Sequence, residues 1–324
     1  MTHRVLVTGA AGYLGSNLVA TLAGRAARDG DPACIVATDV RDVPAGRRLP
    51  GVEYVTLDVR TPGLAAVLAE HTIDTVVHLA AIVTPGPKSN RELEYSVDVL
   101  GTRNVLEACI GSGVRRIVVT SSGAAYGYYP DNPAWLTEDH PVRGNEAFAY
   151  SHHKRLVEEM LAEYRRTHPA LEQVVFRVGT ILGETTRNQI TALFERKRLL
   201  AIRGSASPFV FIWDRDVAGA IERAIFGGPA GIYNVAGDGA LSIQEIAARL
   251  GKRCIMLPPG LLRAVLAVLH PIGLSRYGPE QVDFLRYRPV LDNRRLKEVF
   301  GYVPQLTSIE VFELFRKSHG LGPA

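Results

Sequence analysis

The chain has 324 residues, of which 47% are hydrophobic and 22% are charged, and its formal net charge at pH 7 is +4. This composition is that of an ordinary soluble globular protein, and the length leaves room for one large α/β domain or for two lobes. The charge is spread along the chain, without the basic stripe and interleaved aromatic residues of a nucleic-acid-binding surface. We therefore expect no nucleic acid as a partner.

Cysteine use and apolar runs set the expected compartment. Cys34, Cys109 and Cys254 lie far apart, with neither a CxxC pair nor a metal-ligand spacing, which predicts a reducing, intracellular setting and no metal site. The longest apolar stretch, 261–269, is shorter than the ~20 residues that span a bilayer, so it is expected to be a packed or lid helix. The first strand is expected within a few residues of the start, which leaves no room for a signal peptide. We expect a cytoplasmic protein with no membrane partner.

The first half of the chain alternates two patterns. Short apolar runs rich in valine and isoleucine predict strands that are buried on both faces of a parallel sheet, and helical periodicity fills the stretches between them. The expected strands are 4–8, 34–38, 75–79, 117–120 and 174–177, and the expected helices are 13–28, 63–70, 91–110 and 150–167. Repeated βα units of this spacing predict a Rossmann-type, doubly wound parallel sheet.

After Gly183 the pattern changes. A helix at 191–200, a strand at 209–213, a helix at 216–226, a strand at 232–235 and a helix at 242–250 are expected. Ser242 and Glu245 form a capping-box signature at the start of the last of these. The remainder predicts a smaller lobe of helices and loops. We expect a first domain of residues 1–180, to which 209–237 return, and a C-terminal lobe of 181–208 and 238–324.

The first expected strand runs directly into a glycine-rich turn and then into a helix. A pyrophosphate needs close approach to backbone N–H groups and to the positive end of a helix, and glycine permits both because it has no Cβ. The position of the turn between a strand and a helix strengthens this interpretation over a merely tight turn. The turn predicts a dinucleotide site formed by Gly9, Gly12, Tyr13, Leu14 and Gly15.

Asp39 ends the second expected strand, where a carboxylate can accept hydrogen bonds from a ribose diol. A carboxylate would also repel the 2′-phosphate of NADP, so NAD is favoured. Arg41 lies two residues on and partly offsets that repulsion. NADP therefore stays open as an alternative.

Two further segments are expected beside the cofactor. Asp58 and Val59 follow a strand-like run and are expected to face the adenine, with a plain loop carboxylate as the alternative for Asp58. The small residues at the end of the next strand would let the backbone pass close to the cofactor. These are Leu79, Ala80 and Ala81, and His78 before them is expected to be a packing residue.

Tyr150 and Lys154 lie four residues apart, which places both side chains on one face of a helix. A free phenol has a pKa of about 10 and is a poor base at neutral pH, but a fixed cation nearby favours the phenolate. The pair is therefore suited to moving a proton between an alcohol and a carbonyl. By itself the spacing is also typical of a solvated surface pair. Ser122, in a small polar loop after a strand, lies where ligands bind in a doubly wound sheet.

Several motifs occur together in one order. They are TGxxGxxG from Thr8, HLAA from His78, TSSGAAYG from Thr120, YxxxK from Tyr150 and the FIWDRDVA run from Phe211. In this combination the chain resembles the extended short-chain dehydrogenase/reductase family, of the NAD-dependent epimerase/dehydratase type. The resemblance covers nearly the whole chain. It implies an NAD(P)-binding first domain and a substrate-binding C-terminal lobe.

The resemblance also implies roles for individual residues. Tyr150 would be the general base or acid, Ser122 would hydrogen-bond the reacting oxygen, and Lys154 would hold the nicotinamide ribose and assist the tyrosine. The backbone at Val178 would pass the nicotinamide. Substrate contacts are expected from Ser122 and Gly123, and from Tyr126, for which aromatic packing is an equal alternative. A homodimer formed through helices 91–110 and 150–167 is expected.

The chain departs from the family pattern at two places. Asp98 replaces an asparagine in the usual Asn-Val-x-Gly-Thr motif, which puts an inherited proton relay in doubt. Phe209 stands where nucleotide-sugar members carry an arginine that grips the diphosphate, and Trp213 replaces the usual histidine. An apolar residue cannot neutralise phosphate charge. Arg187, Arg196, Arg203 or Arg288 could substitute from another direction, although a surface role is the favoured interpretation of each.

These observations predict an NAD(P)-dependent oxidoreductase or epimerase that transfers hydride at an alcohol carbon of a small-molecule substrate. A sugar-like or nucleotide-sugar substrate is the leading interpretation. A dehydrogenase or reductase of a more apolar, non-nucleotide hydroxy or keto compound is an alternative. A third alternative, of another class, is a non-catalytic NAD(P) sensor.

Overall fold

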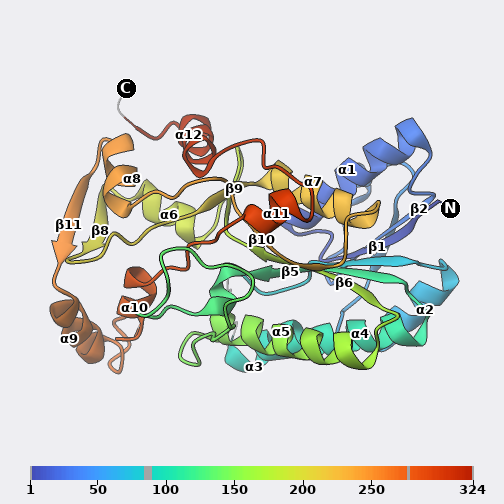
Figure 1. The fold of residues 1–324 in the computed structure, drawn as a ribbon, viewed down its shortest axis with the longest axis horizontal. Coiled ribbons are helices and arrows are strands. Elements are labelled where there is room, and N and C mark those ends of the chain that lie inside the picture. Colours follow the sequence, from blue (N-terminus) through green and yellow to red (C-terminus); the bar gives the residue numbers. More distant parts are fainter. Residues whose placement is uncertain (1, 84–89, 276–277, 323–324) are drawn as a thin grey trace.

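The computed structural model describes residues 2–83, 90–275 and 278–322. A seven-stranded parallel sheet forms its centre, with the strand order β10-β6-β5-β4-β1-β2-β3 (Figure 1). The strands are β1 (Arg4–Thr8), β2 (Cys34–Asp39), β3 (Glu53–Thr56), β4 (Thr75–His78), β5 (Arg116–Ser122), β6 (Glu172–Val178) and β10 (Gly231–Val235). The strand order reverses between β1 and β4, so the sheet is doubly wound as the sequence predicts.

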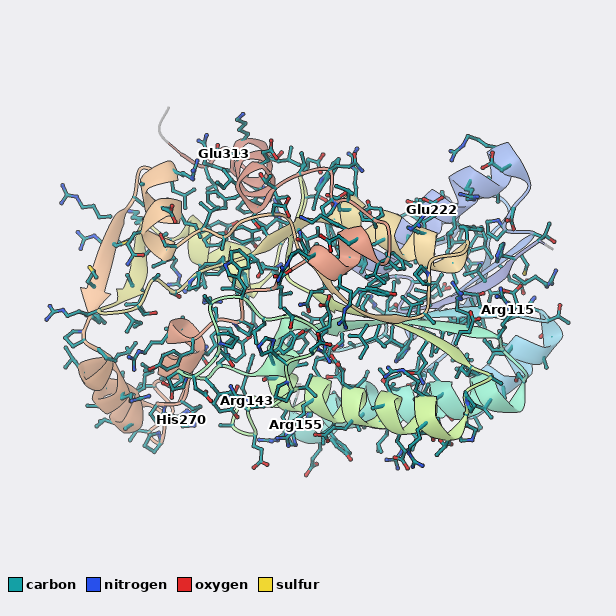
Figure 2. All side chains as sticks on the ribbon, viewed as in Figure 1. Arg115, Arg143, Arg155, Glu222, His270 and Glu313 are labelled. Carbon is teal, nitrogen blue, oxygen red and sulfur yellow. The ribbon has the colours of Figure 1, made fainter. Side chains whose placement is uncertain are left out.

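Helices cover both faces of this sheet (Figure 1). One face carries α1 (Tyr13–Asp29) and α7 (Asp214–Ile225), and the other carries α2 (Gly63–Glu70), α4 (Gly101–Gly111) and α5 (Ala149–Thr167). Glu222 of α7 and Arg155 of α5 mark these opposite layers in Figure 2. A separate apolar core lies on each side of the sheet, because alternate residues of the buried strands point to opposite faces.

The expected helix 91–110 is divided by a π-helical turn. It consists of α3 (Arg91–Tyr95), the π-turn Ser96–Leu100 and α4. The first residue of α4, Gly101, lies against the loop after β3, where an added Cβ would come within 2.9 Å of Val59 Cγ2. The glycine therefore lets the helical segment approach this loop closely.

The remaining elements lie mostly in the left part of the molecule in Figure 1, except for residues 294–298, which lie against β10. They are β7 (Thr180–Leu182), α6 (Gln189–Glu195), β8 (Arg198–Ile202), β9 (Phe211–Trp213), α8 (Ile243–Arg249), β11 (Arg253–Leu257), α9 (Pro259–Leu269), α10 (Gln281–Arg286), α11 (Arg294–Glu298) and α12 (Ser308–Ser318). β8 pairs with β11, and β7 pairs with β9. Phe194, Phe209, Phe211, Phe312 and Phe315 form the centre of their apolar core.

The expected helix 191–200 is wrong in its second half. Helix α6 ends at Glu195, and Arg196 adopts an extended conformation with φ −60° and ψ 146°. From Arg198 onward Leu199 and Ala201 are buried while Leu200 is exposed, which is the two-residue period of a strand. The capping box of Ser242 at the start of α8 is confirmed.

The apolar stretch 261–269 lies in α9, and no residue of this helix is buried. Leu261 and Val268 are 54% and 63% exposed. Of the two expected alternatives, the packed helix is therefore wrong for the outward face of α9, which contacts the short helix α10, and the lid helix stays a prediction. In the described part of the chain, no helix is long and apolar enough to cross a membrane.

Candidate active site

The glycine turn lies between β1 and α1 and is tightly packed. Gly9 has φ +68°, and a Cβ there would lie 2.7 Å from the backbone nitrogen of Ala80. A Cβ at Gly15 would lie 2.2 Å from the carbonyl oxygen of Gly9. Helix α1 begins at Tyr13 without a side-chain cap and with no acidic residue in its first turn. Its N-terminal N–H groups and its dipole therefore suit an anion such as a pyrophosphate.

Tyr13 connects this turn to the start of α7. Its hydroxyl donates a hydrogen bond to Asp214 Oδ2 at 2.6 Å and accepts one from Thr186 Oγ1 at 2.8 Å. Burial, and then the Asp214 carboxylate, raise the pKa of Tyr13. Leu14 packs against the apolar core on this side of the sheet. The phenol of Tyr13 therefore links the glycine turn to the segment that follows β7.

Asp39 lies at the end of β2, next to the glycine turn. Its Oδ2 accepts a hydrogen bond from the Ala11 N–H at 3.0 Å. Its Oδ1 accepts from the Arg41 backbone at 2.9 Å and from Arg41 Nε at 3.1 Å. The Asp39 carboxylate is thus fixed beside the glycine turn, where a ribose diol is expected. The Arg41 guanidinium, which was expected to offset the carboxylate's charge in part, lies against it.

Asp58 and Val59 have other partners in the structure. The guanidinium of Arg60 binds both carboxylate oxygens of Asp58, and this hydrogen bonding lowers the pKa of Asp58. Val59 is 6% exposed and packs into the core on the α4 side. These contacts favour the alternative of a plain loop carboxylate for Asp58, and the contact of Val59 with adenine stays a prediction.

His78 lies at the centre of a buried chain of hydrogen bonds. Thr102 Oγ1 donates to the Asp98 carbonyl at 2.6 Å, so it must accept from His78 Nε2, which is 3.0 Å away. The opposite ring nitrogen, Nδ1, then accepts from Thr8 Oγ1 at 2.8 Å. Burial and, next, the Lys154 ammonium lower the pKa of His78 to about 3, so the ring is neutral at physiological pH. His78 is a buried structural residue, as predicted.

The same chain fixes the backbone after β4. Thr8 Oγ1 accepts hydrogen bonds from the N–H groups of Leu79 at 3.2 Å and Ala80 at 3.3 Å. This places Leu79, Ala80 and Ala81 directly beside the glycine turn, against Gly9. The segment expected along the cofactor and the turn expected at its pyrophosphate therefore adjoin each other.

Ser122, Tyr150 and Lys154 come from the end of β5 and the first turns of α5. Lys154 is 7% exposed, and its Nζ donates to the Thr120 carbonyl of β5 at 2.9 Å. The same Nζ lies 5.8 Å from the centroid of the Tyr150 ring. Ser122, two residues beyond Thr120, accepts a hydrogen bond from the Ala124 N–H at 3.1 Å. The Lys154 ammonium is therefore held in place close to the half-buried Tyr150 ring.

Two contacts bring α5 and β6 to this point of the sheet. Ser151 Oγ donates to the Ala124 carbonyl at 2.7 Å, which ties the start of α5 to the turn that follows Ser122. Ser122 pairs in register with Val178 of β6. Val178, expected to pass the nicotinamide, therefore lies beside Ser122 at the carboxyl edge of the sheet, where ligands bind in doubly wound folds.

The predicted substrate contact of Tyr126 is wrong. Its side chain is fully buried, and its hydroxyl lies 2.8 Å from Asn234 Oδ1 and 2.9 Å from the Thr137 carbonyl. It also accepts a hydrogen bond from Arg177 Nη1 at 2.8 Å, and burial raises the pKa of Tyr126 to about 12. The packing alternative therefore holds for Tyr126.

Gly123 was also expected at the substrate. It is buried, and an added Cβ would lie 3.1 Å from Leu291 Cδ2. The Cα of Gly123 thus faces a leucine of the C-terminal part of the chain and not an open surface. Ser122, directly before Gly123, lies only partly buried, whereas 123–127 are buried.

An aromatic cluster beside Tyr150 was missed from the sequence. The Phe148 ring lies 6.3 Å from that of Tyr150, 5.7 Å from that of Tyr128 and 4.9 Å from that of Phe284. Phe148 lies two residues before Tyr150, a spacing that does not predict contact at a helix start, and Phe284 comes from α10, far along the chain. Neither residue therefore carried a local signal. The cluster forms an apolar wall next to the Tyr150 ring.

Arg288 is the cation of this wall. Its guanidinium lies 4.0 Å from the centroid of the Phe209 ring and 4.9 Å from that of Phe284. Burial lowers the pKa of Arg288 to about 10, which leaves it charged at neutral pH. Its Nε donates to Ser207 Oγ at 3.3 Å, and within the described ranges no carboxylate forms an ion pair with it. Arg288 therefore has N–H groups to offer to an anion.

Comparisons with known proteins agree with these motifs. The model of a family described as the NAD dependent epimerase/dehydratase family matches residues 5–236. UDP-glucose 4-epimerase of Mycolicibacterium smegmatis is 32% identical over 333 residues, which cover 95% of each chain. An uncharacterized protein of Mycobacterium tuberculosis is 28% identical over 321 residues, covering 98% of this chain and 85% of that protein.

Solved structures show the same fold. UDP-glucose 4-epimerase of Thermus thermophilus, in complex with NAD, superposes with a TM-score of 0.72 at 25% identity, covering 97% of this chain and 98% of that one. dTDP-glucose 4,6-dehydratase of Bacillus anthracis, also in complex with NAD, gives a TM-score of 0.74 at 19% identity, covering 98% and 97% of the two chains.

Proposed function

The chain belongs to the NAD-dependent epimerase/dehydratase family and is an NAD-dependent enzyme of the short-chain dehydrogenase/reductase type; we propose that it transfers hydride at an alcohol carbon of a sugar-like or nucleotide-sugar substrate. The observation that carries the proposal is the Lys154 ammonium, which is fixed to the Thr120 carbonyl and lies against the Tyr150 ring. Membership of an enzyme family argues against the alternative of a non-catalytic sensor.

The residues present fit a bound dinucleotide. Gly9 and Gly15 leave no room for a Cβ against the neighbouring backbone, so the turn stays tight, and the uncapped start of α1 offers N–H groups to a pyrophosphate. Asp39 lies next to this turn and would accept the ribose hydroxyls. When bound there, NAD would supply the hydride acceptor. Tyr13, Leu14, Leu79, Ala80, Ala81 and Val178 complete the proposed cofactor site.

The proton chemistry rests on three side chains of the enzyme. Tyr150, as phenolate, takes the proton from the substrate hydroxyl and returns it when a carbonyl is reduced. Lys154 stabilises the phenolate through its positive charge and is placed to hold the nicotinamide ribose. The Ser122 hydroxyl donates a hydrogen bond to the reacting oxygen. Both an epimerase and a dehydrogenase need this proton transfer.

Arg288 is the proposed contact for the anionic part of the substrate. Phe209 stands where nucleotide-sugar members of the family carry an arginine, and its ring lies under the Arg288 guanidinium. A single guanidinium, presented by two aromatic rings, can still bind a phosphate through paired N–H groups. We therefore propose that Arg288 substitutes for the missing clamp from the α10 side of the site.

The aromatic wall favours a second candidate function. The Phe148 ring lies next to that of Tyr150 and contacts those of Tyr128 and Phe284, and Trp213 replaces a polar residue of the family pattern. Aromatic faces bind apolar bodies and sugar rings but do not neutralise a diphosphate. A dehydrogenase or reductase of a non-nucleotide hydroxy or keto compound is the alternative that this wall supports.

The test is turnover by the wild-type enzyme of a panel of nucleotide sugars and of simple apolar alcohols, with NAD binding measured in parallel. Tyr150→Phe should abolish turnover, and Ser122→Ala should reduce it by at least ~100-fold, while both variants keep NAD binding. Retained turnover in Tyr150→Phe would contradict the mechanism. Cofactor that stays bound through turnover supports an epimerase, and release of NADH supports a dehydrogenase.

The form of the enzyme in the cell is also proposed. A groove with a cavity of about 450 Å³ lies between α3, α4 and α5 and is lined by Tyr95, Leu156, Met160 and Tyr164 among others. We propose that a second copy covers it in a homodimer, and Leu156→Arg should then yield a monomer in light scattering.

The three free cysteines support a reducing, cytoplasmic location.

A further inference from the structure

Asp98 and His153 form a buried pair that the mechanism above does not use. They are 3% and 1% exposed, and Asp98 Oδ2 lies 3.4 Å from His153 Nδ1. This separation is longer than a good hydrogen bond. Neither atom has another hydrogen-bonding partner among the described residues. Buried polar atoms with such incomplete bonding are unfavourable for stability and call for an explanation in function.

Asp98 lies in the π-turn between α3 and α4 and reaches the cofactor side of the sheet. Its Oδ1 accepts a hydrogen bond from the Ile82 N–H at 2.8 Å. Ile82 directly follows Ala81, the last residue of the segment that lies along the glycine turn. A π-turn is less favourable than a regular helical turn and occurs frequently at functional sites. The irregular turn thus presents one carboxylate to the proposed cofactor segment.

His153, the other member of the pair, lies on α5, the helix that carries Tyr150 and Lys154. It directly precedes Lys154 in α5, and its ring packs edge-on against Tyr95 of α3, with centroids 5.7 Å apart. Asp98 and Lys154 line the same cavity of about 10 Å³, together with His78 and Thr120. This volume is that of about one water molecule. Asp98 therefore adjoins both the helix and the cavity of the catalytic lysine.

We propose that Asp98, paired with His153, is a positioning residue that holds Lys154 in register with the cofactor segment after β4. One carboxylate joins the two elements: Oδ1 binds the backbone at Ile82, and Oδ2 faces α5 at His153. The charged or titratable groups that face Asp98 are His153 and Lys154 from α5 and His78 from β4. The effect of this link on catalysis rests on the proposed function, because that function gives Lys154 its role. The contacts of Asp98 do not depend on it.

The proposal is tested by the titration of Tyr150 and by NAD affinity, neither of which needs a substrate. The Tyr150 signal is the tyrosine Cζ resonance of the carbon-13-labelled protein that disappears in Tyr150→Phe. In Asp98→Ala, Lys154 should lose its fixed place, so the titration midpoint of Tyr150 should rise, and NAD should bind about fivefold or more weakly, as for one lost hydrogen bond. Asp98→Asn, which keeps an acceptor for Ile82 and a polar partner for His153, should restore both.

A second variant examines the pair from α5. His153→Leu should raise the midpoint of Tyr150 in the same direction, and the double variant with Asp98→Ala should add little, because the two residues act through one link. Tyr164→Phe is the matched control: it removes a contact of α5 with Glu107 of α4 further along the helix and should change neither readout. A folded Asp98→Ala protein with an unchanged midpoint and unchanged NAD affinity would overturn the proposal. A failure to turn over nucleotide sugars would count against the proposed function alone.

Discussion

Helix α5 carries two buried acid–base pairs that differ in completeness. The first pair, Glu158 with Arg177 of β6, is well bonded: Glu158 Oε2 lies 2.6 Å from Arg177 Nη2, and Glu158 Oε1 accepts from Ser121 at 2.6 Å. Arg177 also donates to Tyr126. One and a half turns earlier, His153 and Asp98 remain 3.4 Å apart. The first pair has its buried polar atoms bonded, whereas the second leaves Asp98 Oδ2 and His153 Nδ1 without a good hydrogen bond, so the two should differ in what they contribute to stability.

The largest expected effect on stability comes from breaking the Glu158–Arg177 pair. Glu158→Ala leaves the Arg177 guanidinium buried without its counter-charge, which should lower the free energy of unfolding by about 3–5 kcal/mol. Asp98→Ala should lower it by only about 1–2 kcal/mol, because it removes one good hydrogen bond, from the Ile82 N–H, and one long contact with His153. Urea denaturation of both variants measures the difference. Equal losses would remove the distinction between the two pairs.

Tyr126→Phe should have the next largest effect. It leaves Asn234 Oδ1 without its phenol partner and takes an acceptor from Arg177, so we expect a loss of about 1–3 kcal/mol in urea denaturation. Because Tyr126 is fully buried, NAD affinity and turnover of the folded variant should match the wild type. A large change in KM with unchanged stability would instead restore the substrate contact that the sequence suggested.

The comparison also explains what the sequence could predict. Three features could be predicted because each depends on residues that lie close together in the sequence. They are the strands of the central sheet, the glycine turn and the Tyr150–Lys154 spacing. The position of Tyr126 depends on Asn234, which is 108 residues away along the chain. No pattern within one element indicates such a partner. Tyr126 therefore looked like a substrate contact when it is part of the core.

The same reason applies to other residues that were missed or misread. The π-turn at Asp98 has no signature of its own in a helical pattern, and its partner His153 lies on another helix. Phe284 reaches the site only because α10 packs against the loop of Tyr128. The strand at 198–202 was assigned to a helix because a short apolar run fits both periods until its pairing with β11 is known.

The smallest expected effect concerns Glu138, whose contribution to stability through its charge can be measured apart from that of its hydrogen bond. Glu138 Oε1 accepts from the Asn234 N–H at 2.7 Å, next to Tyr126, and burial raises the pKa of Glu138. The folded protein therefore binds this proton more tightly than the unfolded chain does, so stability falls as the pH rises through the folded pKa.

Glu138→Gln keeps the acceptor for Asn234 and removes the charge. We expect the variant to be slightly more stable than the wild type at pH 7, with the gain fading as the pH falls through the raised folded pKa of Glu138 toward the usual carboxyl value of about 4. Urea denaturation across this pH range, with wild type alongside, measures the difference. A loss of stability at pH 7 would mean that the Glu138 charge, through the neighbouring Arg295 and Arg177, stabilises the network despite its burial. The Glu158–Arg177 pair would then depend on Glu138 as a third charge. The comparison with Asp98 and His153 would then be between a network of three charges and a single pair.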